Sequence, residues 1–238
     1  MTRAIIDDDF RNWPPRPEPI EDCPVRPTLK DIPIRMMDLP TDRGFPVPWF
    51  VDWIDGTPEF RLMNGEKWKR AVREKLCWVC GKKLGAYLCF VLGPMCGITR
   101  TTSEPACHRE CARWSARFCP FLSRPHMMRR GQEELAAAGA QSMGGTGLSR
   151  NPGVVLLWSA RDYKVFRPEG GGMLIQVGDP LEVEWWAEGR KATRDEVQES
   201  IRTGLPSLEE VARQEDGAME DLSRRVTAFE QYLPGESQ

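Results

Sequence analysis

The sequence lacks a long apolar run and a recognisable leader peptide. No stretch approaches the roughly 20 apolar residues that a membrane-spanning helix needs. The first nine residues hold no adequate apolar core and end in three aspartates, Asp7 to Asp9, so they do not match a signal peptide. We therefore expect a cytoplasmic protein with no membrane partner. In that compartment the eight cysteines are expected to be thiols or metal ligands, rather than the disulfide framework that an even count also suits.

Histidine is scarce, with two residues in a chain of 238, and common catalytic motifs are missing. There is no Gly-x-Ser-x-Gly motif, no Walker motif and no dinucleotide fingerprint. The glycine-rich run 144–147 is not a phosphate loop, because no Gly-Lys-Ser/Thr follows it. Acidic residues are plentiful but scattered, and no carboxylate pair stands out. The sequence therefore favours a non-enzymatic protein, identifies no catalytic residue and leaves enzyme activity undecided.

Two pairs of soft metal ligands are present, about thirty residues apart. Cys77 and Cys80 stand three positions apart and precede Gly81, as in a zinc knuckle. His108 and Cys111 have i, i+3 spacing, so both can face one point from the first turn of a helix. Four such ligands predict a closed, tetrahedral, structural Zn²⁺ site, and a closed site leaves no position for a catalytic water.

The remaining cysteines leave the ligand set open. Cys107 is an alternative to His108, because residues 107 and 111 also share a helix face. Cys96 and Cys119 are more remote substitutes. A zinc deaminase is disfavoured, because its His-x-Glu motif precedes its Pro-Cys-x-x-Cys motif, whereas here the Cys-x-x-Cys comes first.

Composition divides the chain into four segments. Residues 1–43 hold eight prolines and predict an extended, proline-rich arm, because proline removes a backbone donor. Residues 44–130 predict a hairpin, a helix and the zinc module. Residues 131–152 have the glycine content of a linker. Residues 153–238 predict an antiparallel β-meander followed by two C-terminal helices, so we expect an α+β fold with a treble-clef-like zinc module.

Turn and capping residues set the first elements. Asp55 and Gly56 lie between two apolar runs and predict a hairpin over 47–63. Asn64 is expected to cap a helix over 65–76. One face of that helix is apolar and the rest is rich in lysine and arginine, which indicates a helix packed along one side.

The zinc module is expected to consist of a knuckle, a short strand and a helix. The apolar run 86–92 suits a buried strand, and a loop is expected over 95–103. The helix is expected over 105–118, because proline is favoured in the first position of a helix and Pro105 stands there. It would carry the last two ligands in its first turn, which is the order of a treble clef.

Strands and then helices are predicted in the C-terminal segment. The turns between the strands are too short for parallel crossovers, so the pattern predicts an antiparallel meander. Thr193 and Glu196 form a capping box that opens a helix. Ser207 begins a second capping box, whose helix continues toward the C-terminus unless Gly217 breaks it. The four expected strands are 154–158, 163–166, 173–177 and 181–186.

Charge is unevenly distributed, although the net charge of the chain is −2. Residues 61–130 carry fifteen basic and four acidic side chains, a net charge of +11, and both flanking regions are negative. This asymmetry predicts an anionic partner for the central segment. The alternative is that the acidic ends fold back on the basic centre and neutralise it, and the sequence does not decide between the two.

Arginine is the best indication of function. Arg109, Arg113 and Arg117 recur at i, i+4 and i+8 and form one stripe on the predicted helix, with Arg129 and Arg130 beyond it. The guanidinium fork suits phosphate, because it donates two hydrogen bonds in a fixed geometry. These five arginines are the predicted nucleic-acid-binding residues. The nearby aromatic residues fit a small core better than base stacking; they are Trp114, Phe118 and Phe121.

Several longer sequence motifs are distinctive: Cys77-Trp78-Val79-Cys80-Gly81, Phe90 to Cys96, Glu104-Pro105 with His108 to Ala112, and Cys119 to Leu122. Together with residues 45–52 and 183–194, these motifs resemble those of a group of uncharacterised proteins encoded by bacteriophages and prophages. The likeness extends over most of the chain beyond residue 40. The group brings no established activity and so implies no catalytic residues. It implies a phage gene product in the bacterial cytoplasm that binds nucleic acid or blocks a host factor.

The sequence thus predicts a non-enzymatic protein with structural zinc that binds DNA or RNA or has a regulatory role. One alternative is a protein-interaction module that inhibits a host factor, on account of the acidic C-terminal helix and the proline-rich arm. The other is an enzyme with a site in the C-terminal region. A pocket there would be lined by Trp158, Asp162, Tyr163, Trp185 and Trp186.

Overall fold

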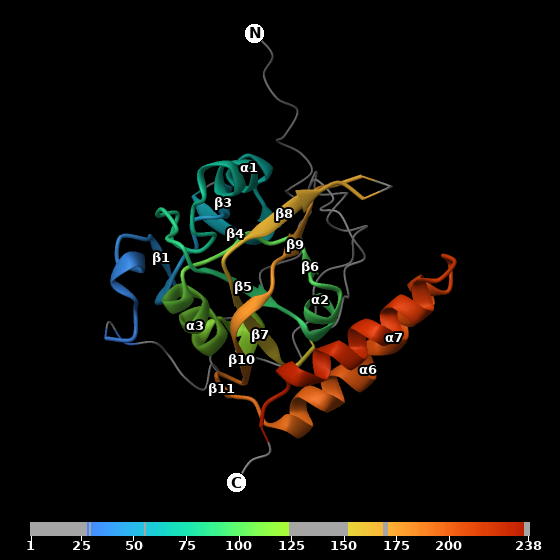
Figure 1. Cartoon of the computed structure of the whole chain (residues 1–238). Helices are drawn as coiled ribbons and strands as arrows, with labels where there is room; N and C mark the ends of the chain where they lie inside the picture. The colour runs from blue at the N-terminus through green and yellow to red at the C-terminus, as the bar shows by residue number, and fades with distance from the viewer. Residues whose placement is uncertain (1–27, 29, 55, 124–151, 169–170, 236–238) are drawn as a thin grey trace, which may run out of the picture.

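The main sheet is built around a strand that is buried along its whole length. This strand, β7 (Val155–Ala160), has no exposed side chain in the computed structural model of the chain, which describes residues 28, 30–54, 56–123, 152–168 and 171–235. A strand covered on both faces has apolar residues at successive positions, and five of its six residues are apolar. The strand order is β11-β10-β7-β5, and every pair is antiparallel (Figure 1). The other strands are β5 (Leu88–Leu92), β10 (Pro180–Ala187) and β11 (Arg190–Lys191).

Helices cover both faces of this sheet. On one face lies α3 (Arg109–Phe118), which packs against β5, β7 and β10. On the other face, α2 (Pro94–Thr99) contacts β7, and the ring of Phe229 lies parallel to that of Trp158 at a centroid distance of 6.4 Å. Figure 1 shows α3 on one side of the sheet and the C-terminal helices on the other. The core therefore lies in two layers, one on each face of β7.

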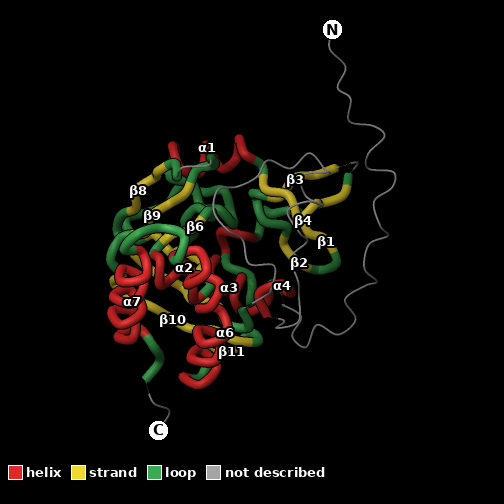
Figure 2. The backbone as a smooth tube through the Cα atoms, turned by 90° about the vertical axis from the view of Figure 1, so that its right-hand side faces the viewer, coloured by secondary structure: helices red, strands yellow, loops and turns green. Residues whose placement is uncertain are grey.

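The remaining strands form three smaller sheets. One contains β6 (Thr101–Thr102), β9 and β8, with β9 in the middle. The predicted hairpin is confirmed as β3 and β4, which pair antiparallel around Gly56. A second short pair, β1 and β2, lies on the same side of the molecule as this hairpin (Figure 2). Their bounds are β1 (Thr41–Asp42), β2 (Phe45–Pro46), β3 (Val51–Ile54), β4 (Thr57–Met63), β8 (Tyr163–Phe166) and β9 (Leu174–Val177).

The predicted α+β class with antiparallel strands is confirmed, but the strands do not pair in chain order. Strand β7 pairs with β10 and with β5, and β8 pairs with β9. The predicted meander did not include β5, because about sixty residues lie between β5 and β7. In the structure β5 supplies the second neighbour that the fully buried β7 requires.

Described residues on both sides of 131–152 share one sheet and one hydrophobic core. The predicted linker lies outside the described residues except for Pro152, and so do residues 1–27 of the predicted arm. The described end of the arm lies on the protein, with Met36 buried in the core and Asp38 paired to Lys82 at 2.7 Å. The boundaries of the four predicted segments stay predictions.

The N-terminal helices follow the sequence in part. The helix α1 (Gly65–Glu74) begins as predicted, since the Asn64 side chain accepts a hydrogen bond from the Lys67 amide. The expected loop after β5 instead contains α2, whose first residue is Pro94. The helix α3 ends at Phe118 as predicted but begins at Arg109, four residues later than expected, and is followed by the short α4 (Pro120–Ser123).

The C-terminal helices are α6 (Arg194–Ala212) and α7 (Ala218–Phe229), followed by a single 3₁₀ turn at Glu230–Tyr232. The capping box of Thr193 and Glu196 is present. The prediction that Ser207 begins a second capping box is wrong, because α6 runs through Pro206 and places Ser207 inside the helix. The predicted interruption near Gly217 is present, since α6 ends at Ala212 and Gly217, with a φ of +76°, is the N-cap residue of α7. Among the described helices, none combines the length and apolar character needed to cross a membrane.

Candidate metal centre

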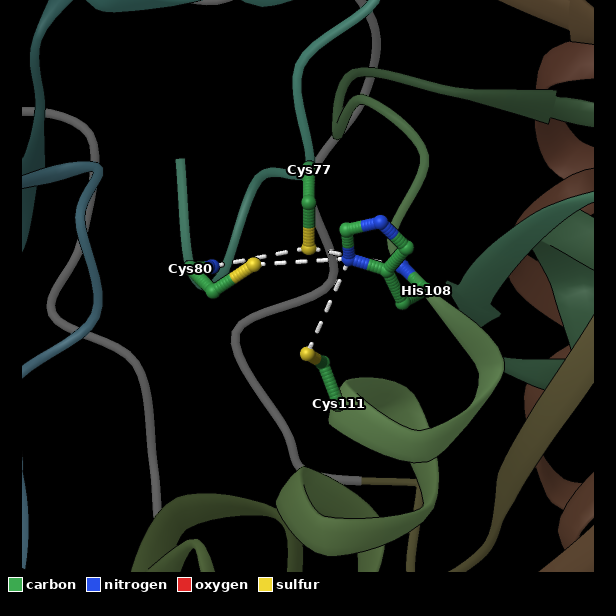
Figure 3. A group of neighbouring side chains, drawn as sticks. All are labelled: Cys77, Cys80, His108 and Cys111. Atoms are coloured by element: carbon green, nitrogen blue, oxygen red, sulfur yellow. Dashed lines mark hydrogen bonds between the residues drawn. The ribbon is translucent and has the colours of Figure 1, made fainter. Parts of the chain in front are cut away.

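A tight loop after α1 presents the first two cysteines. Lys75 ends α1 in a left-handed conformation, and Leu76 then forms a β-bridge with Lys83. Between them the Cys77 amide donates to the Lys82 carbonyl at 2.8 Å, and the Gly81 amide donates to the Cys77 carbonyl at 2.8 Å. These bonds turn the chain so that both thiols of the Cys-x-x-Cys face the same side (Figure 3).

Gly81 is required by this loop for two reasons. Its φ is +70°, a conformation that residues with a Cβ rarely adopt. A Cβ at this position would also lie 2.6 Å from Cγ of Trp49, whose ring packs edge-on against Trp78. The glycine predicted to fold the backbone under the metal thus also admits an indole ring beneath the loop.

The second pair of ligands stands at the beginning of α3. Cys107 and Cys89 exchange two backbone hydrogen bonds, of 2.7 and 3.0 Å. This bridge keeps residue 107 extended, so α3 begins only after His108, which is its N-cap residue. Cys111 is then the third helical residue, and its side chain is fully buried.

The four predicted ligands converge on one point. Their ligand atoms all lie within 4.8 Å of one another, and Figure 3 shows the three sulfurs arranged around one nitrogen of the imidazole. Nδ1 of His108 lies 3.4 Å from Sγ of Cys80 and 4.0 Å from Sγ of Cys111. Tetrahedral zinc, with Zn–S near 2.3 Å and Zn–N near 2.0 Å, separates sulfur from nitrogen by about 3.6 Å. This Cys₃His group could therefore hold a metal ion.

The protonation of the imidazole is set by its outer nitrogen. Nε2 of His108 lies 2.9 Å from the carbonyl oxygen of Lys83. A carbonyl only accepts, so Nε2 carries a proton in this contact, and Nδ1 is the nitrogen that faces the sulfurs and would bind a metal ion. The knuckle thereby orients the ligand supplied by α3.

Backbone amides and neighbouring side chains shift the pKa values of the thiols. Sγ of Cys77 accepts from the amides of Cys80 at 3.4 Å and His108 at 3.3 Å. Burial opposes ionisation of Cys77, but hydrogen bonds from Cys107, Cys111, Cys80 and His108 together lower its pKa. Hydrogen bonds to Cys77 and Cys80 raise the pKa of Cys111, and those to the same two sulfurs raise the pKa of His108 to about 10. The group thus favours a positive charge at its centre, which a cation bound there would supply.

The other cysteines that the structure describes lie outside this group. A hydrogen bond to Cys77, followed by burial, raises the pKa of the Cys107 thiol well above its usual value. Cys107 is not a member of the group, and His108 is its fourth member. Burial raises the pKa of Cys89 to about 12. Cys96 and Cys119 are half-buried and are not members of the group either.

The arginine stripe of α3 faces acidic residues of β10. Arg109 pairs with Glu182 at 2.8 Å, and Arg113 pairs with the buried Glu184 at 2.7 Å. Arg117 lies 3.9 Å from Asp31 and covers the ring of Phe118. Trp114 and Phe118 are buried, as the core interpretation predicted. Arg129 and Arg130 lie outside the described residues.

The aromatic residues predicted for a C-terminal pocket belong to the core instead. Trp158 is fully buried, and Trp185 is buried with its Nε1 donating to the Tyr232 carbonyl at 2.7 Å. Tyr163 donates its hydroxyl to the Val72 carbonyl at 3.1 Å. Each ring is held by packing or by a backbone carbonyl, so these residues do not converge on a substrate cavity.

Sequence reasoning missed the glutamates that meet the arginines. Glu182 and Glu184 alternate along β10, and each lies about seventy residues from its partner on α3. The available signal was the polar–apolar alternation in the run 182–185, which marks a strand with a polar stripe on one face. Nothing local connects that stripe to the arginines.

Comparison of the chain with protein-family models, with curated proteins and with solved structures finds no match. The resemblance to phage-encoded proteins therefore stays a prediction.

Proposed function

We propose that Cys77, Cys80, His108 and Cys111 bind one structural Zn²⁺ ion. Three sulfurs and one imidazole nitrogen are the donor set that tetrahedral zinc prefers. With four protein ligands, the ion has no open position for water, and its contribution is to folding. The ligands follow the end of α1 and begin α3, so the ion ties these two helices together.

The test is metal content combined with a measure of tertiary structure. Purified protein is expected to contain about one zinc per chain, and a strong chelator is expected to abolish the near-ultraviolet circular dichroism of the buried tryptophans. Cys80→Ser should lose the metal, whereas Cys96→Ser, a change outside the group, should keep it. A Cys80→Ser variant that retains stoichiometric zinc would overturn the proposal.

We further propose that this zinc-organised region binds nucleic acid and has no enzymatic activity of its own. The observation that carries the proposal is the composition of α1 and the knuckle: residues 65–83 hold seven basic and two acidic side chains. Such clustering is the electrostatic footprint of a phosphate-binding surface. The predicted α3 stripe is a second basic surface, although Arg109 and Arg113 are already paired with glutamates of β10.

Binding is tested with labelled single-stranded and double-stranded oligonucleotides across a salt series. We expect an affinity that falls steeply as salt rises, because each phosphate contact releases condensed counterions. An absence of binding even at low salt would overturn the proposal.

The C-terminal region supports a second candidate, a regulatory protein that binds a protein partner. Residues 180–238 hold fourteen acidic and seven basic side chains, and α6 and α7 lie at the end of the molecule opposite to α1 (Figure 1). This candidate predicts a stoichiometric complex that survives nuclease treatment. The complex should dissociate when the acidic residues of α6 and α7 are replaced by neutral amides.

A further inference from the structure

Several basic residues lie around the knuckle at positions that the sequence did not single out. The Leu84 amide donates to the Lys75 carbonyl at 2.8 Å, which places the end of α1 beside the knuckle. The ammonium of Lys83 bonds to the Glu74 carbonyl, at the C-terminal end of α1. Three basic residues are thereby gathered at one helix end: Arg73, Lys75 and Lys83.

The turn before β8 extends this surface. The hydroxyl of Tyr163 bonds to the Val72 carbonyl, so the start of β8 lies against α1, and both views show the two elements side by side (Figures 1 and 2). In the same turn, the guanidinium of Arg161 stands 5.3 Å from the ring centroid of Tyr87. Tyr87 is 55% exposed, so its ring is accessible from solvent.

The cations of this surface are less neutralised than those of α3. Among the described residues, the Lys75 ammonium has no hydrogen-bond or ion-pair partner, and Arg161 is engaged only with Tyr87. The acidic residues at the surface are Glu74, which is shared by Arg70 and Arg73, and the exposed Asp162. A net positive surface with an exposed ring thus lies directly on the metal-binding loop.

We infer that this α1–knuckle surface, made of Arg73, Lys75, Lys83, Tyr87 and Arg161, binds single-stranded nucleic acid. The inference rests on the proposed nucleic-acid binding and names its site and its substrate class. Lysine and arginine track the phosphates, and an exposed aromatic ring stacks on an unpaired base, which a duplex does not offer. The arginine already placed over Tyr87 can pair a phosphate or stack on the same base.

The test compares two variants that each lose three positive charges. One is Arg73→Gln/Lys75→Gln/Lys83→Gln, and its matched control on the C-terminal helices is Arg202→Gln/Arg213→Gln/Arg224→Gln. For single-stranded DNA and RNA, the first should weaken binding by about tenfold or more and reduce the salt slope by about 2, because each lost contact removes about 0.7 from that slope. The control should bind like the unmodified protein. Metal content and near-ultraviolet circular dichroism should be unchanged in both.

Tyr87→Ala separates stacking from charge. It should weaken binding to single strands by about fivefold or more, with the salt slope unchanged, since a stacked base contributes without releasing ions. Duplexes should bind more weakly than single strands to the unmodified protein. Equal or tighter binding to duplexes would overturn the substrate class.

The two proposals fail in different ways. If Arg109→Gln/Arg117→Gln abolishes binding while the α1–knuckle variant binds normally, the inferred site is wrong and nucleic-acid binding itself stands. If the unmodified protein binds no nucleic acid at any salt concentration, the proposed function is wrong.

Discussion

The helices α1 and α3 are both ten residues long and both rich in basic residues, yet their charges meet different neighbours. The first two arginines of α3 pair with Glu182 and Glu184 on β10, one of which is buried. On α1, Lys69, Arg70 and Arg73 pair only with exposed or half-exposed glutamates of their own helix. Local pairs of this kind contribute little and are screened by salt. The positive potential of a segment is therefore decided by what the fold places opposite each side chain.

Breaking the metal group should have the largest effect, because the group joins the two helices. His108→Ala should lower metal affinity by more than about 100-fold, since loss of a second-shell partner alone costs about 10–100-fold. Cys107→Ser keeps all four members of the group and should lower affinity by far less. Competition titration with a chromophoric chelator measures both, and equal losses would contradict the assignment of His108 as the ligand.

Distorting the knuckle should have the next largest effect on stability, and the distortion should be confined to the loop that follows α1. Gly81→Ala adds a Cβ 2.6 Å from Trp49 at a positive φ, so we expect a loss of about 2–4 kcal/mol in the free energy of unfolding. Gly85→Ala is the matched control, because a Cβ there meets no atom within 4 Å. Urea denaturation of both variants, with zinc present, gives the comparison. Equal stabilities would show that the loop accommodates the side chain.

Neutralising Glu184 should weaken the packing of α3 against β10. Its carboxylate is only 8% exposed and accepts from Arg113 and Lys191. These bonds outweigh burial and lower the pKa of Glu184. We expect Glu184→Gln to cost about 1–3 kcal/mol in the free energy of unfolding, as for a buried charged hydrogen bond. Glu182→Gln, at a side chain that is 38% exposed, should cost less than about 1 kcal/mol.

The same pair of variants sharpens the comparison of the two basic helices. If pairing with β10 is what neutralises α3, Glu184→Gln together with Glu182→Gln should increase the affinity for nucleic acid. An unchanged affinity would show that the stripe stays inaccessible to phosphate even when its partners are removed.

Apart from the Glu182→Gln control, the smallest effect is expected in α6, far from both basic helices. The hydrogen bond from Arg190, followed by those from Thr193, lowers the pKa of Glu196 to about 2 despite some burial. Because the folded-state pKa lies below the usual 4.5, the stabilisation is fully present above about pH 4.5 and is lost as the pH falls toward 2. Glu196→Gln should therefore cost about 1 kcal/mol.

Urea denaturation at several pH values checks this prediction. Between pH 7 and pH 5 the difference between the variant and the unmodified protein should be constant, since both pKa values lie below that range. It should shrink only at lower pH. A difference that changes between pH 7 and pH 5 would assign the effect to another group.

The features predicted correctly from the sequence are those whose determinants lie within a few residues of one another. Asn64 and Thr193 cap helices through hydrogen bonds to the third residue ahead. The two ligand pairs have spacings that a loop and a helix turn enforce locally. Predictions failed where a distant contact overrode a local signal. Pro105 suggested a helix start, but the bridge of Cys107 to Cys89 keeps the chain extended, and Ser207 suggested a cap at a point where α6 continues.

The sequence by itself determined the positions of the two ligand pairs, the α+β class and the caps at Asn64 and Thr193, because short-range geometry dictates each of them. Tertiary structure alone decided that β5 pairs with β7, that His108 rather than Cys107 completes the metal group, and that the arginines of α3 meet glutamates of β10. Those outcomes depend on which segments a buried strand and a shared core bring together, and such long-range contacts leave no mark in local sequence.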